Sequence, residues 1–322
     1  MEEYPFVSVI IPALNAESTI GLCLESIKLL DYPVGKLEII VVDNGSTDRT
    51  REIAESFGAK VLHKPKLKVG ALRNCGAKIA NGEVLAFTDS DCLVPKSWLI
   101  EAFEILKDGN IGATGGGYLV PENATWIERA WVVPPQRKHG ETLYLPTGSF
   151  ILRKEIFEKI GGFDEKLIAG EDDDISIRIR KAGYKLILCS NCYVLHLGYP
   201  KTLYQVVRKQ IWHGQSMLFS IRHFFSMLSI LSHLFTISLI LMPIAIILAI
   251  KYSYWPLLVP LFFIFMLPPS LLSCKKFFRN NIRFDKIALL HLFIIYTAYL
   301  CGRSIALLYV YKALFARFRK FF

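Results

Sequence analysis

The segment F-V-S-V-I-I-P at residues 6–12 decides the fold that we expect for this chain of 322 residues. It is a nearly continuous run of β-branched and other apolar residues ended by a proline, which is typical of a strand buried on both faces of a parallel sheet. Similar runs follow at residues 37–42, 59–62 and 83–88, and helical patterns separate them. This alternation with short connections predicts an α/β fold, with a mostly parallel sheet flanked by helices.

Polar residues stand where these predicted strands end. In parallel α/β sheets, ligands bind at the carboxyl ends of the strands. We therefore expect the following side chains to converge on one crevice: Asn15, Asp43, Asp48, Asp89 and Asp91.

The pattern beyond residue 110 is less regular. We expect a strand at 111–120 that three glycines interrupt, a short strand at 149–152, and helices at 154–160 and from Glu171 onward. Residues 202–223 form an amphipathic, aromatic-rich stretch that is typical of a segment lying along a membrane surface.

Long uncharged stretches set the carboxyl-terminal third apart. The chain is 52% hydrophobic, and residues 224–250, 252–274 and 287–302 contain no Asp, Glu, Lys or Arg. Uncharged runs of this length predict transmembrane helices. We expect spans at about 228–250 and 253–274, with a further candidate at 287–311 in which Arg303 favours a protein-facing or interfacial position.

The formal charge of +10 raises the possibility of a nucleic-acid partner, but no nucleic-acid-binding motif accompanies it. The basic residues gather instead beside the apolar runs, for example at Lys275, Lys276, Arg279 and Arg283. This placement follows the positive-inside rule and favours contact with anionic lipid headgroups. With an acidic amino terminus that shows no secretory signal, it predicts a multi-pass protein of the cell membrane whose soluble part is cytoplasmic.

The seven cysteines agree with a reducing compartment, because their number is odd and they are scattered. Cys189 and Cys192 form a C-x-x-C pair, but there is no second pair nearby to complete a zinc site. We expect two reduced, partly buried thiols.

Asp89 and Asp91 are the first candidates for chemistry. Two carboxylates two residues apart, just past the apolar strand V-L-A-F-T, can face one Mg²⁺ or Mn²⁺ ion. Such an ion neutralises charge on a diphosphate leaving group. His196 follows a short strand and becomes a third ligand only if it reaches the Asp91 metal.

A run of four acids, Glu171 to Asp174, opens a predicted helix. The helix dipole explains part of this, but four acids exceed what a cap requires, so one of them is a candidate general base for an acceptor hydroxyl. Asp43 is a candidate for hydrogen bonds to a nucleoside. Lys68, Arg73 and Asn74 bring positive charge to the same edge, which suits a diphosphate.

Taken together, these motifs resemble family 2 glycosyltransferases, which have the GT-A fold. The resemblance covers roughly residues 5–215, and its motifs follow the family's order. They are V-S-V-I-I-P-A-L-N-A-E (7–17), V-V-D-N-G-S-T-D (41–48), R-N followed by A-N-G-E (73–83), T-D-S-D (88–91), G-S-F-I-L-R (148–153), G-G-F-D-E (161–165), G-E-D-D-D (170–174) with R-I-R-K-A-G-Y (178–184), and R-K-Q-I-W-H-G (208–214).

The resemblance implies roles for individual residues. The donor nucleoside, most often uridine, would be held by Pro12, Ala13, Asn15, Glu17 and Asp43, with Arg73, Asp89 and Ser90 near the nucleotide. Asp91 would be the direct metal ligand, with Asp89 and His196 beside it. Asp172, paired with Glu171, would be the base of an inverting displacement. Gly148, Ser149 and Trp212 would line the acceptor side, although Arg208, Gln210 and Trp212 match the processive members' Q-x-x-R-W element only loosely, which favours single-sugar addition.

The resemblance also implies a domain plan. Residues 1–200 would be a cytoplasmic catalytic domain, 201–225 interfacial helices and 226–322 the transmembrane region. The expected reaction moves a sugar from a nucleotide-sugar to a lipid-linked or polysaccharide acceptor with Mn²⁺ or Mg²⁺. Two alternatives stay open at this point. A nucleotidyltransferase would need a glycine-rich basic loop where A-L-N-A-E stands, and a non-catalytic scaffold would not need the acids at 89, 91 and 172.

Overall fold

The computed structural model describes residues 4–132, 137–216, 227–279 and 286–318. The chain divides into two compact units. The first unit comprises residues 1–122 and 134–198, and the second comprises 123–133 and 199–322. The short segment 123–133 leaves the first unit and returns to it, an excursion that no sequence pattern indicated.

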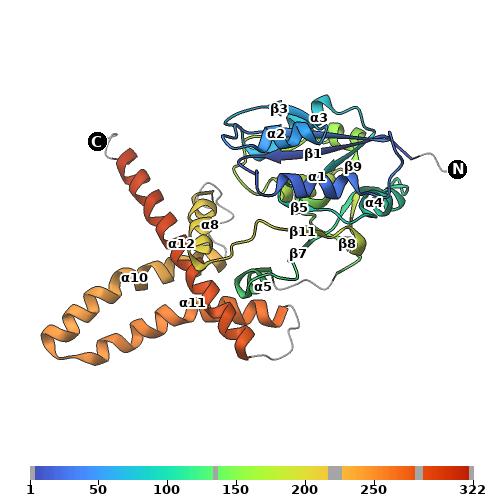
Figure 1. The fold of residues 1–322 in the computed structure, drawn as a ribbon. Coiled ribbons are helices and arrows are strands. Elements are labelled where there is room, and N and C mark those ends of the chain that lie inside the picture. The colour runs from blue at the N-terminus through green and yellow to red at the C-terminus, as the bar shows by residue number, and fades with distance from the viewer. Residues whose placement is uncertain (1–3, 133–136, 217–226, 280–285, 319–322) are drawn as a thin grey trace. The chain divides into compact units, whose positions relative to one another are not determined.

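The first unit is built on an eight-stranded sheet (Figure 1). In spatial order its strands are β3 (Lys60–His63), β2 (Leu37–Asp43), β1 (Val7–Ala13), β4 (Val84–Phe87), β9 (Phe150–Arg153), β6 (Ile111–Gly115), β10 (Lys185–Leu188) and β8 (Gly140–Thr142). The first four pair in parallel and β10 pairs in parallel with β6. The expected mostly parallel sheet is thereby confirmed.

Strand β9 runs antiparallel to both of its neighbours, β4 and β6. The sequence predicted this short strand but not its direction or its place. Its insertion carries the chain back across the sheet, so that the segment preceding β9 lies at the end of the sheet where β4 ends.

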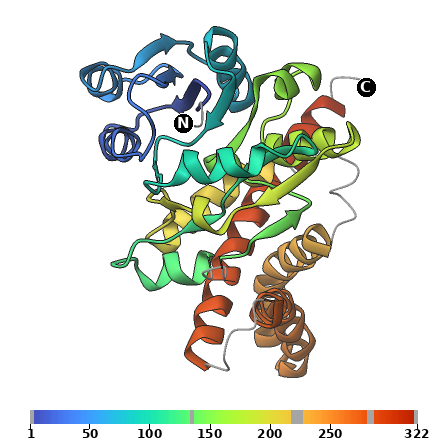
Figure 2. The same ribbon diagram turned by 90° about the vertical axis from the view of Figure 1, so that its right-hand side faces the viewer.

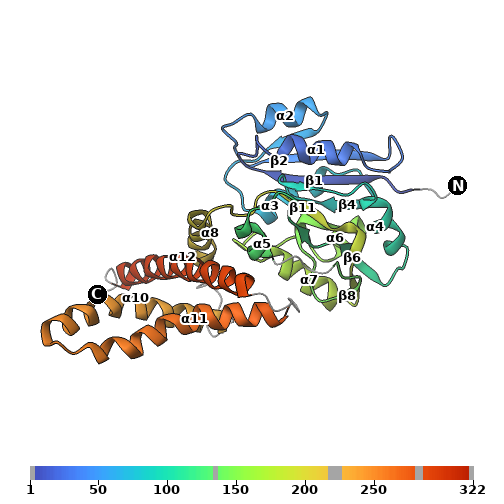
Figure 3. The ribbon, with the colours of Figure 1, turned by 60° about the horizontal axis from the view of Figure 1, so that its bottom comes forward.

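Two hydrophobic cores cover the two faces of this sheet. Along β1, Val9 and Ile11 join one core and Ile10 joins the other, as the alternation of side chains in a strand requires. One core is shared with α1 (Ile20–Lys28), α2 (Thr50–Ser56) and α4 (Trp98–Leu106), the other with α3 (Val69–Ile79), α6 (Lys154–Lys159) and α7 (Glu171–Lys181). Figure 3 shows α1 and α2 on one side of β1 and α7 on the other.

A second, three-stranded sheet joins β5 (Cys92–Leu93), β11 (Val194–His196) and β7 (Tyr118–Leu119). The single strand expected at 111–120 is therefore split between two sheets. Gly116 lies at the break, where a Cβ atom would stand 2.1 Å from the backbone carbonyl of Cys192. Only glycine permits this crossing, and the crossing brings His196 alongside the D-x-D turn.

The second unit is helical. Its helices are α5 (Trp126–Val132), α8 (Leu203–Ser216), α10 (Met227–Tyr252), α11 (Leu258–Arg279) and α12 (Lys286–Phe318). Among the residues that the structure describes, three segments are long and apolar enough to cross a membrane: Met227–Tyr252, Trp255–Phe278 and Lys286–Lys312. They include both spans expected from the sequence and the further candidate. Figure 2 shows α8 in yellow beside α12 in red, in agreement with their extensive contacts.

Arg303 lies on α12 and faces protein, as its place within an apolar segment predicted. It is 8% exposed, its Nε atom donates to Oε1 of Gln210 on α8 (2.9 Å), and its Nη2 atom donates to the hydroxyl of Tyr299. Gly302 lets the helices approach, because a Cβ atom there would lie 2.5 Å from the carbonyl oxygen of Val207. The buried face of α8 is thus fixed against α12.

Candidate active site

Arg73 is the centre of a buried chain of ion pairs in the first unit. It lies on α3 and is 2% exposed. Its Nη2 atom donates to Oδ1 of Asp89 (2.7 Å), and its Nη1 atom donates to Oε1 of Glu171 (2.8 Å). Because Asp89 follows β4 and Glu171 begins α7, Arg73 ties the D-x-D turn to the acidic helix start. The sequence placed Arg73 near the nucleotide but did not reveal this linking role.

Glu171 and Asp172 differ sharply although they are neighbours. Burial raises the pKa of the Glu171 carboxyl, the Arg73 guanidinium opposes this shift, and the charge of Asp172 adds to it. Asp172 is more exposed and has no ion pair with Arg73. Its Oδ1 atom accepts a hydrogen bond from the backbone N–H of Asp173 (3.0 Å). Of the two predicted catalytic acids, Asp172 is the one whose carboxylate is available to an acceptor.

Tyr144 is a site residue that the sequence did not single out. Its hydroxyl donates to Oδ2 of Asp172 across 2.6 Å. Burial and the charge of Asp172 raise the pKa of the Tyr144 phenol, which therefore stays protonated. No motif marks this tyrosine, because it lies in an irregular segment between β8 and β9 and reaches Asp172 only through the tertiary fold.

Asp91 directly precedes β5 and His196 ends β11, and these two strands are neighbours in the small sheet. The Nε2 atom of His196 lies 3.7 Å from Oδ2 of Asp91, and the His196 ring packs edge-on against Tyr118. Gly198 borders the same carboxylate, because a Cβ atom at this position would stand 1.9 Å from Oδ2 of Asp91. The condition set for His196, that it reach Asp91, is met.

Asp91, Cys92 and His196 form the one cluster of three metal-ligating side chains among the described residues, with ligand atoms within 4.8 Å of one another. A carboxylate and an imidazole suit Mn²⁺ or Mg²⁺ completed by phosphate oxygens. Cys92 is fully buried in a hydrophobic core. Asp89, expected as a further ligand, lies outside this cluster, with its Oδ1 atom bound to Arg73. The residues present therefore fit a divalent cation held mainly by Asp91 and His196.

Asp43 ends β2 and is fully buried. Its carboxylate accepts from the backbone N–H groups of Gly45 (3.1 Å) and Ser46 (3.2 Å) and lies 2.9 Å from Nδ1 of His63. Burial alone would raise the pKa of Asp43, but hydrogen bonds from Ser46 and His63 outweigh it and hold the pKa below the ordinary value of 3.8. Asp43 thus organises the turn after β2, and the half-exposed His63 stands beside it, unnoticed in the sequence.

The ends of β1 and β2 are bonded to each other. Asn15 has a positive φ of 49°, and its side-chain oxygen accepts from the backbone N–H of Thr47 (2.9 Å). The carboxylate of Glu17 accepts from the backbone N–H of Arg49 (3.3 Å). Pro12 and Ala13 are the last residues of β1. These expected donor-binding residues therefore lie together at one sheet edge.

The position of Ser149 differs from the expectation that it lines the acceptor side. Its hydroxyl is fully buried, donates to the carbonyl of Cys192 (2.8 Å), and accepts from Nε1 of Trp98 (2.9 Å) and the backbone N–H of Gly116 (3.0 Å). One donor and two acceptor sites are all that a serine hydroxyl has. Ser149 joins the two sheets and does not line an acceptor site, because no hydrogen-bonding capacity or exposure is left.

Gly148 lies next to Ser149, and its carbonyl accepts from the hydroxyl of Thr88 (2.8 Å). Its backbone N–H donates to the Tyr118 hydroxyl, and a Cβ atom at this position would lie 2.3 Å from the Tyr118 ring. Ser90 is half-buried in the turn between Asp89 and Asp91. Trp212 lies on α8, but its side chain falls outside what the structure describes.

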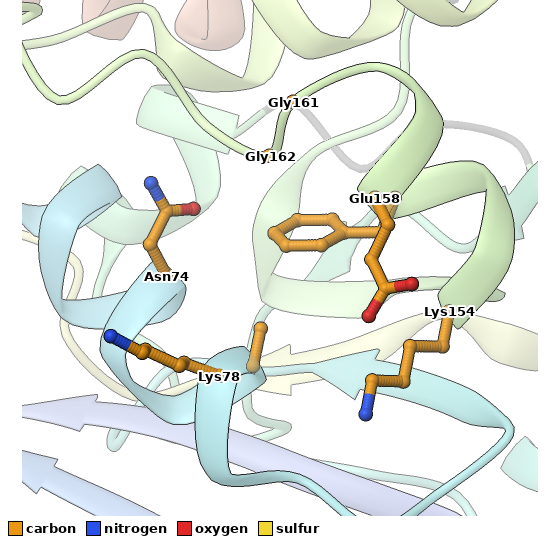
Figure 4. A pocket seen from close by; sticks show the side chains of 8 residues that line it. Asn74, Lys78, Lys154, Glu158, Gly161 and Gly162 are labelled. Atoms are coloured by element: carbon orange, nitrogen blue, oxygen red, sulfur yellow. The ribbon is translucent and has the colours of Figure 1, made fainter.

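A separate hollow of about 310 Å³ lies between α3 and α6 (Figure 4). Asn74, Lys78, Lys154 and Glu158 line it, with Gly161 and Gly162 at its edge. Asn74 binds the backbone of Phe163 through both its amide nitrogen and its oxygen (2.9 Å each). The two residues of the R-N pair thus have different partners: Arg73 binds Asp89 and Glu171, and Asn74 binds the loop before α7. None of the expected catalytic residues lines this hollow.

The fold and the site define a class of enzyme, the nucleotide-sugar-dependent glycosyltransferases with the GT-A fold. Residues 8–163 match the model of glycosyl transferase family 2, and residues 137–205 match that of the N-terminal domain of galactosyltransferase. The chain therefore carries a glycosyl transferase family 2 domain and is a hexosyltransferase-type enzyme. The nucleotidyltransferase and scaffold alternatives are set aside by this match.

Relatives and solved structures match a large part of the chain. Glycosyltransferase AglE of Haloferax volcanii is 29% identical over 225 residues, which cover 66% of this chain and 73% of that protein. The probable glycosyltransferase YdaM of Bacillus subtilis is 35% identical over 208 residues, and the chain spans about half of its length, 49%. The mannosyltransferase PcManGT of Pyrobaculum calidifontis, solved with GDP-Man and Mn²⁺, has the same fold, with a TM-score of 0.57, 21% identity and coverage of 94% and 87% of the two chains.

Proposed function

We propose that this chain is an inverting glycosyltransferase that moves a hexose from a UDP-sugar to a membrane-associated acceptor, such as a polyprenyl-linked saccharide or phosphate. The observation that carries the proposal is the chain Asp89–Arg73–Glu171. It joins the turn that would face the donor diphosphate to the helix that presents Asp172. One buried guanidinium, shared by two carboxylates, would thus connect the leaving-group side to the base.

Asp172 acts as the general base in this proposal. Its carboxylate takes the proton of the acceptor hydroxyl while the acceptor oxygen bonds to the anomeric carbon, and the bond from that carbon to the diphosphate oxygen breaks. The nucleoside diphosphate leaves, and the configuration inverts in the single displacement. Glu171 is unsuited to the same task, because Arg73 holds its carboxylate in a buried ion pair.

Asp91 and His196 would hold a divalent cation, with Asp89 and Ser90 beside it in the turn. Such a cation supplies charge neutralisation for the diphosphate when it is bound. The protein's own contribution is to fix the two ligands: the small sheet carries His196, and Gly198 leaves the space that the Asp91 carboxylate occupies.

The nucleoside would lie at the shared end of β1 and β2. Pro12, Ala13, Asn15 and Glu17 line this edge, and Asn15 is locked to the turn after β2. Asp43 already accepts several hydrogen bonds, so it would shape the nucleoside site chiefly through the turn that it folds.

The second unit would anchor the enzyme beside its acceptor. We propose residues 1–200 as the catalytic domain on the cytoplasmic side, 201–225 as interfacial helices and 226–322 as the membrane region; residues 217–225 of the interfacial part lie outside the described residues. Three helices of sufficient length and apolar character support membrane association, and the basic residues between the second and third favour a cytoplasmic loop. A third span then places Arg317 and Arg319 outside, against that rule, so the tail is the part that a topology experiment must resolve.

The test is donor hydrolysis and thermal shift of the detergent-purified full chain against UDP-sugars and GDP-mannose, with and without Mn²⁺. We expect one UDP-sugar to raise the melting temperature only with the metal and to be hydrolysed slowly. Addition of polyprenyl phosphate or a polyprenyl-linked saccharide should then yield a glycolipid of inverted anomeric configuration. Stabilisation by GDP-mannose alone would overturn the UDP assignment, and retained configuration would overturn the mechanism.

A further inference from the structure

A hydrogen bond joins Tyr144 to Asp172. Tyr144 belongs to the segment between β8 and β9, and Asp172 belongs to the first turn of α7. The phenol hydroxyl donates to Oδ2 of Asp172 (2.6 Å), while Oδ1 accepts from the backbone N–H of Asp173 (3.0 Å). A carboxylate has about four lone-pair sites. Each oxygen is therefore fixed by one donor, and capacity is left for an acceptor hydroxyl.

Contacts other than the Tyr144 hydroxyl hold the segment around Tyr144 in place. The side chain of Thr142 donates to the carbonyl of Tyr144 (3.1 Å). The backbone N–H of Leu145 donates to the hydroxyl of Ser176 on α7 (3.3 Å), and the Leu145 side chain is fully buried in the core. Tyr144 as a whole is only partly exposed, at 38%. The backbone is thus anchored on both sides, and the hydroxyl contributes little to holding the loop in place.

In the hydrogen bond between the two residues, Tyr144 is always the donor and Asp172 the acceptor. Because burial and the neighbouring charge keep the Tyr144 phenol protonated, it donates and does not compete for the proton of the acceptor. An aspartate at a helix start otherwise turns freely about its side-chain torsions or caps its own helix. A donor on Oδ2 removes that freedom, and a catalytic carboxylate must be held within a narrow range of orientations to act.

We propose that Tyr144 is the positioning residue of the base: it holds the Asp172 carboxylate in the orientation that receives the acceptor proton. The inference rests on the proposed function of Asp172. It assigns a role in transfer to a residue outside the family's motifs. It also explains why a partly exposed tyrosine lies beside the acidic first turn of α7.

The experiment uses the full chain in detergent, with the donor found in the panel above. Tyr144→Phe should lower kcat by about tenfold to a hundredfold, the range typical of a group that orients a functional side chain. The affinity for UDP with Mn²⁺ and the melting temperature should not change. Tyr184→Phe is the matched control, since it also removes an exposed tyrosine hydroxyl, one bonded to Lys159, and it should keep the activity of the unaltered chain.

A double-mutant cycle separates positioning from an independent effect. In Asp172→Glu the carboxylate is moved by one methylene and loses the Tyr144 geometry, so adding Tyr144→Phe should then cost little. Equal fold losses in both backgrounds, or full kcat in Tyr144→Phe, would overturn the inference while leaving the proposed function intact. If the unaltered chain transfers no sugar from any donor, the proposed function itself fails.

Discussion

The Nη1 atom of Arg73 lies 2.8 Å from Oε1 of Glu171, although the two residues are 98 positions apart in the chain. Arg73 is fully enclosed and binds Asp89 with its other terminal nitrogen. A buried guanidinium needs such partners, because an unpaired charge in the interior is costly. Arg73 therefore links the turn that holds Asp89 to the start of α7.

Replacement of Arg73 should disrupt both sides at once. Arg73→Met leaves two carboxylates without their partner, and we expect a loss of about 3–5 kcal/mol in the free energy of unfolding. Arg73→Lys should be intermediate, because one ammonium group cannot bridge both acids as a guanidinium does. Thermal melting measures the loss of stability in both variants. If Glu171→Gln fails to restore part of the stability lost in Arg73→Met, the ion pair is not the cause.

Asp172→Asn should abolish transfer and leave nucleotide binding nearly unchanged. The amide cannot take a proton, and loss of a general base lowers rates by about 10²–10⁴-fold. Product formation and calorimetric binding of UDP with Mn²⁺ are the two measurements. Asp173→Asn is the matched control in the same helical turn, and its activity should stay close to that of the unaltered chain. Full activity in Asp172→Asn would remove Asp172 from the mechanism.

Metal-dependent donor binding should depend on Asp91 and, less obviously, on Gly198. Asp91→Ala removes a ligand, and Gly198→Ala puts a methyl group where Oδ2 of Asp91 now lies. Both variants should lose the difference in UDP affinity with and without Mn²⁺, as should the unaltered chain after chelation. Gly109→Ala is the control, since nothing lies within 4 Å of its added Cβ. An unchanged metal response in Asp91→Ala would rule out this site.

Asp43 should make the stability of the first unit sensitive to acid. Its pKa is lower in the folded state than the ordinary value of 3.8, so its stabilising effect is present above that value and is lost as the pH falls through the lowered pKa. Asp43→Asn should cost about 1–3 kcal/mol near neutral pH because the turn donors lose a charged acceptor. The difference in the free energy of unfolding between Asp43→Asn and the unaltered chain should become smaller below about pH 4. Melting curves across this range check it, and a constant difference would contradict it.

Lys276 should stabilise the second unit by holding the end of α5. Its amine donates to the carbonyl oxygens of Ala130 and Trp131, in the last turn of that helix. A cation there satisfies carbonyl groups that have no partner within the helix. Lys276→Met should lower the melting temperature and increase proteolysis of the segment 123–133. The neighbouring Lys275→Met, on an exposed side chain, should do neither; equal effects would mean that α5 is held by apolar packing alone.

The sequence was sufficient for the elements whose signal is local. The strand at residues 6–12 and the apolar spans are recognisable because burial on both faces, or in lipid, requires continuous apolar runs. The acidic motifs were recognisable because short spacing after a strand places their side chains at one sheet edge. The roles of Arg73 and Ser149 could not be recognised from the sequence. Whether a polar side chain binds a ligand or another part of the protein depends on its burial and its partners in the fold.

The sequence by itself thus determined the class of fold and the apolar third of the chain, and it singled out the acids at 89, 91 and 172 as candidate site residues. Only the tertiary structure decided that Glu171 is paired with Arg73, that Asp172 meets Tyr144, and that residues 123–133 belong to the helical unit. The physical reason is that periodicity and spacing act over a few residues, whereas these contacts join segments 28 to 98 positions apart. The sequence shows the glycines at 115–117 and the short strand at 149–152, but it shows neither the antiparallel direction of β9 nor the crossing to a second sheet at Gly116.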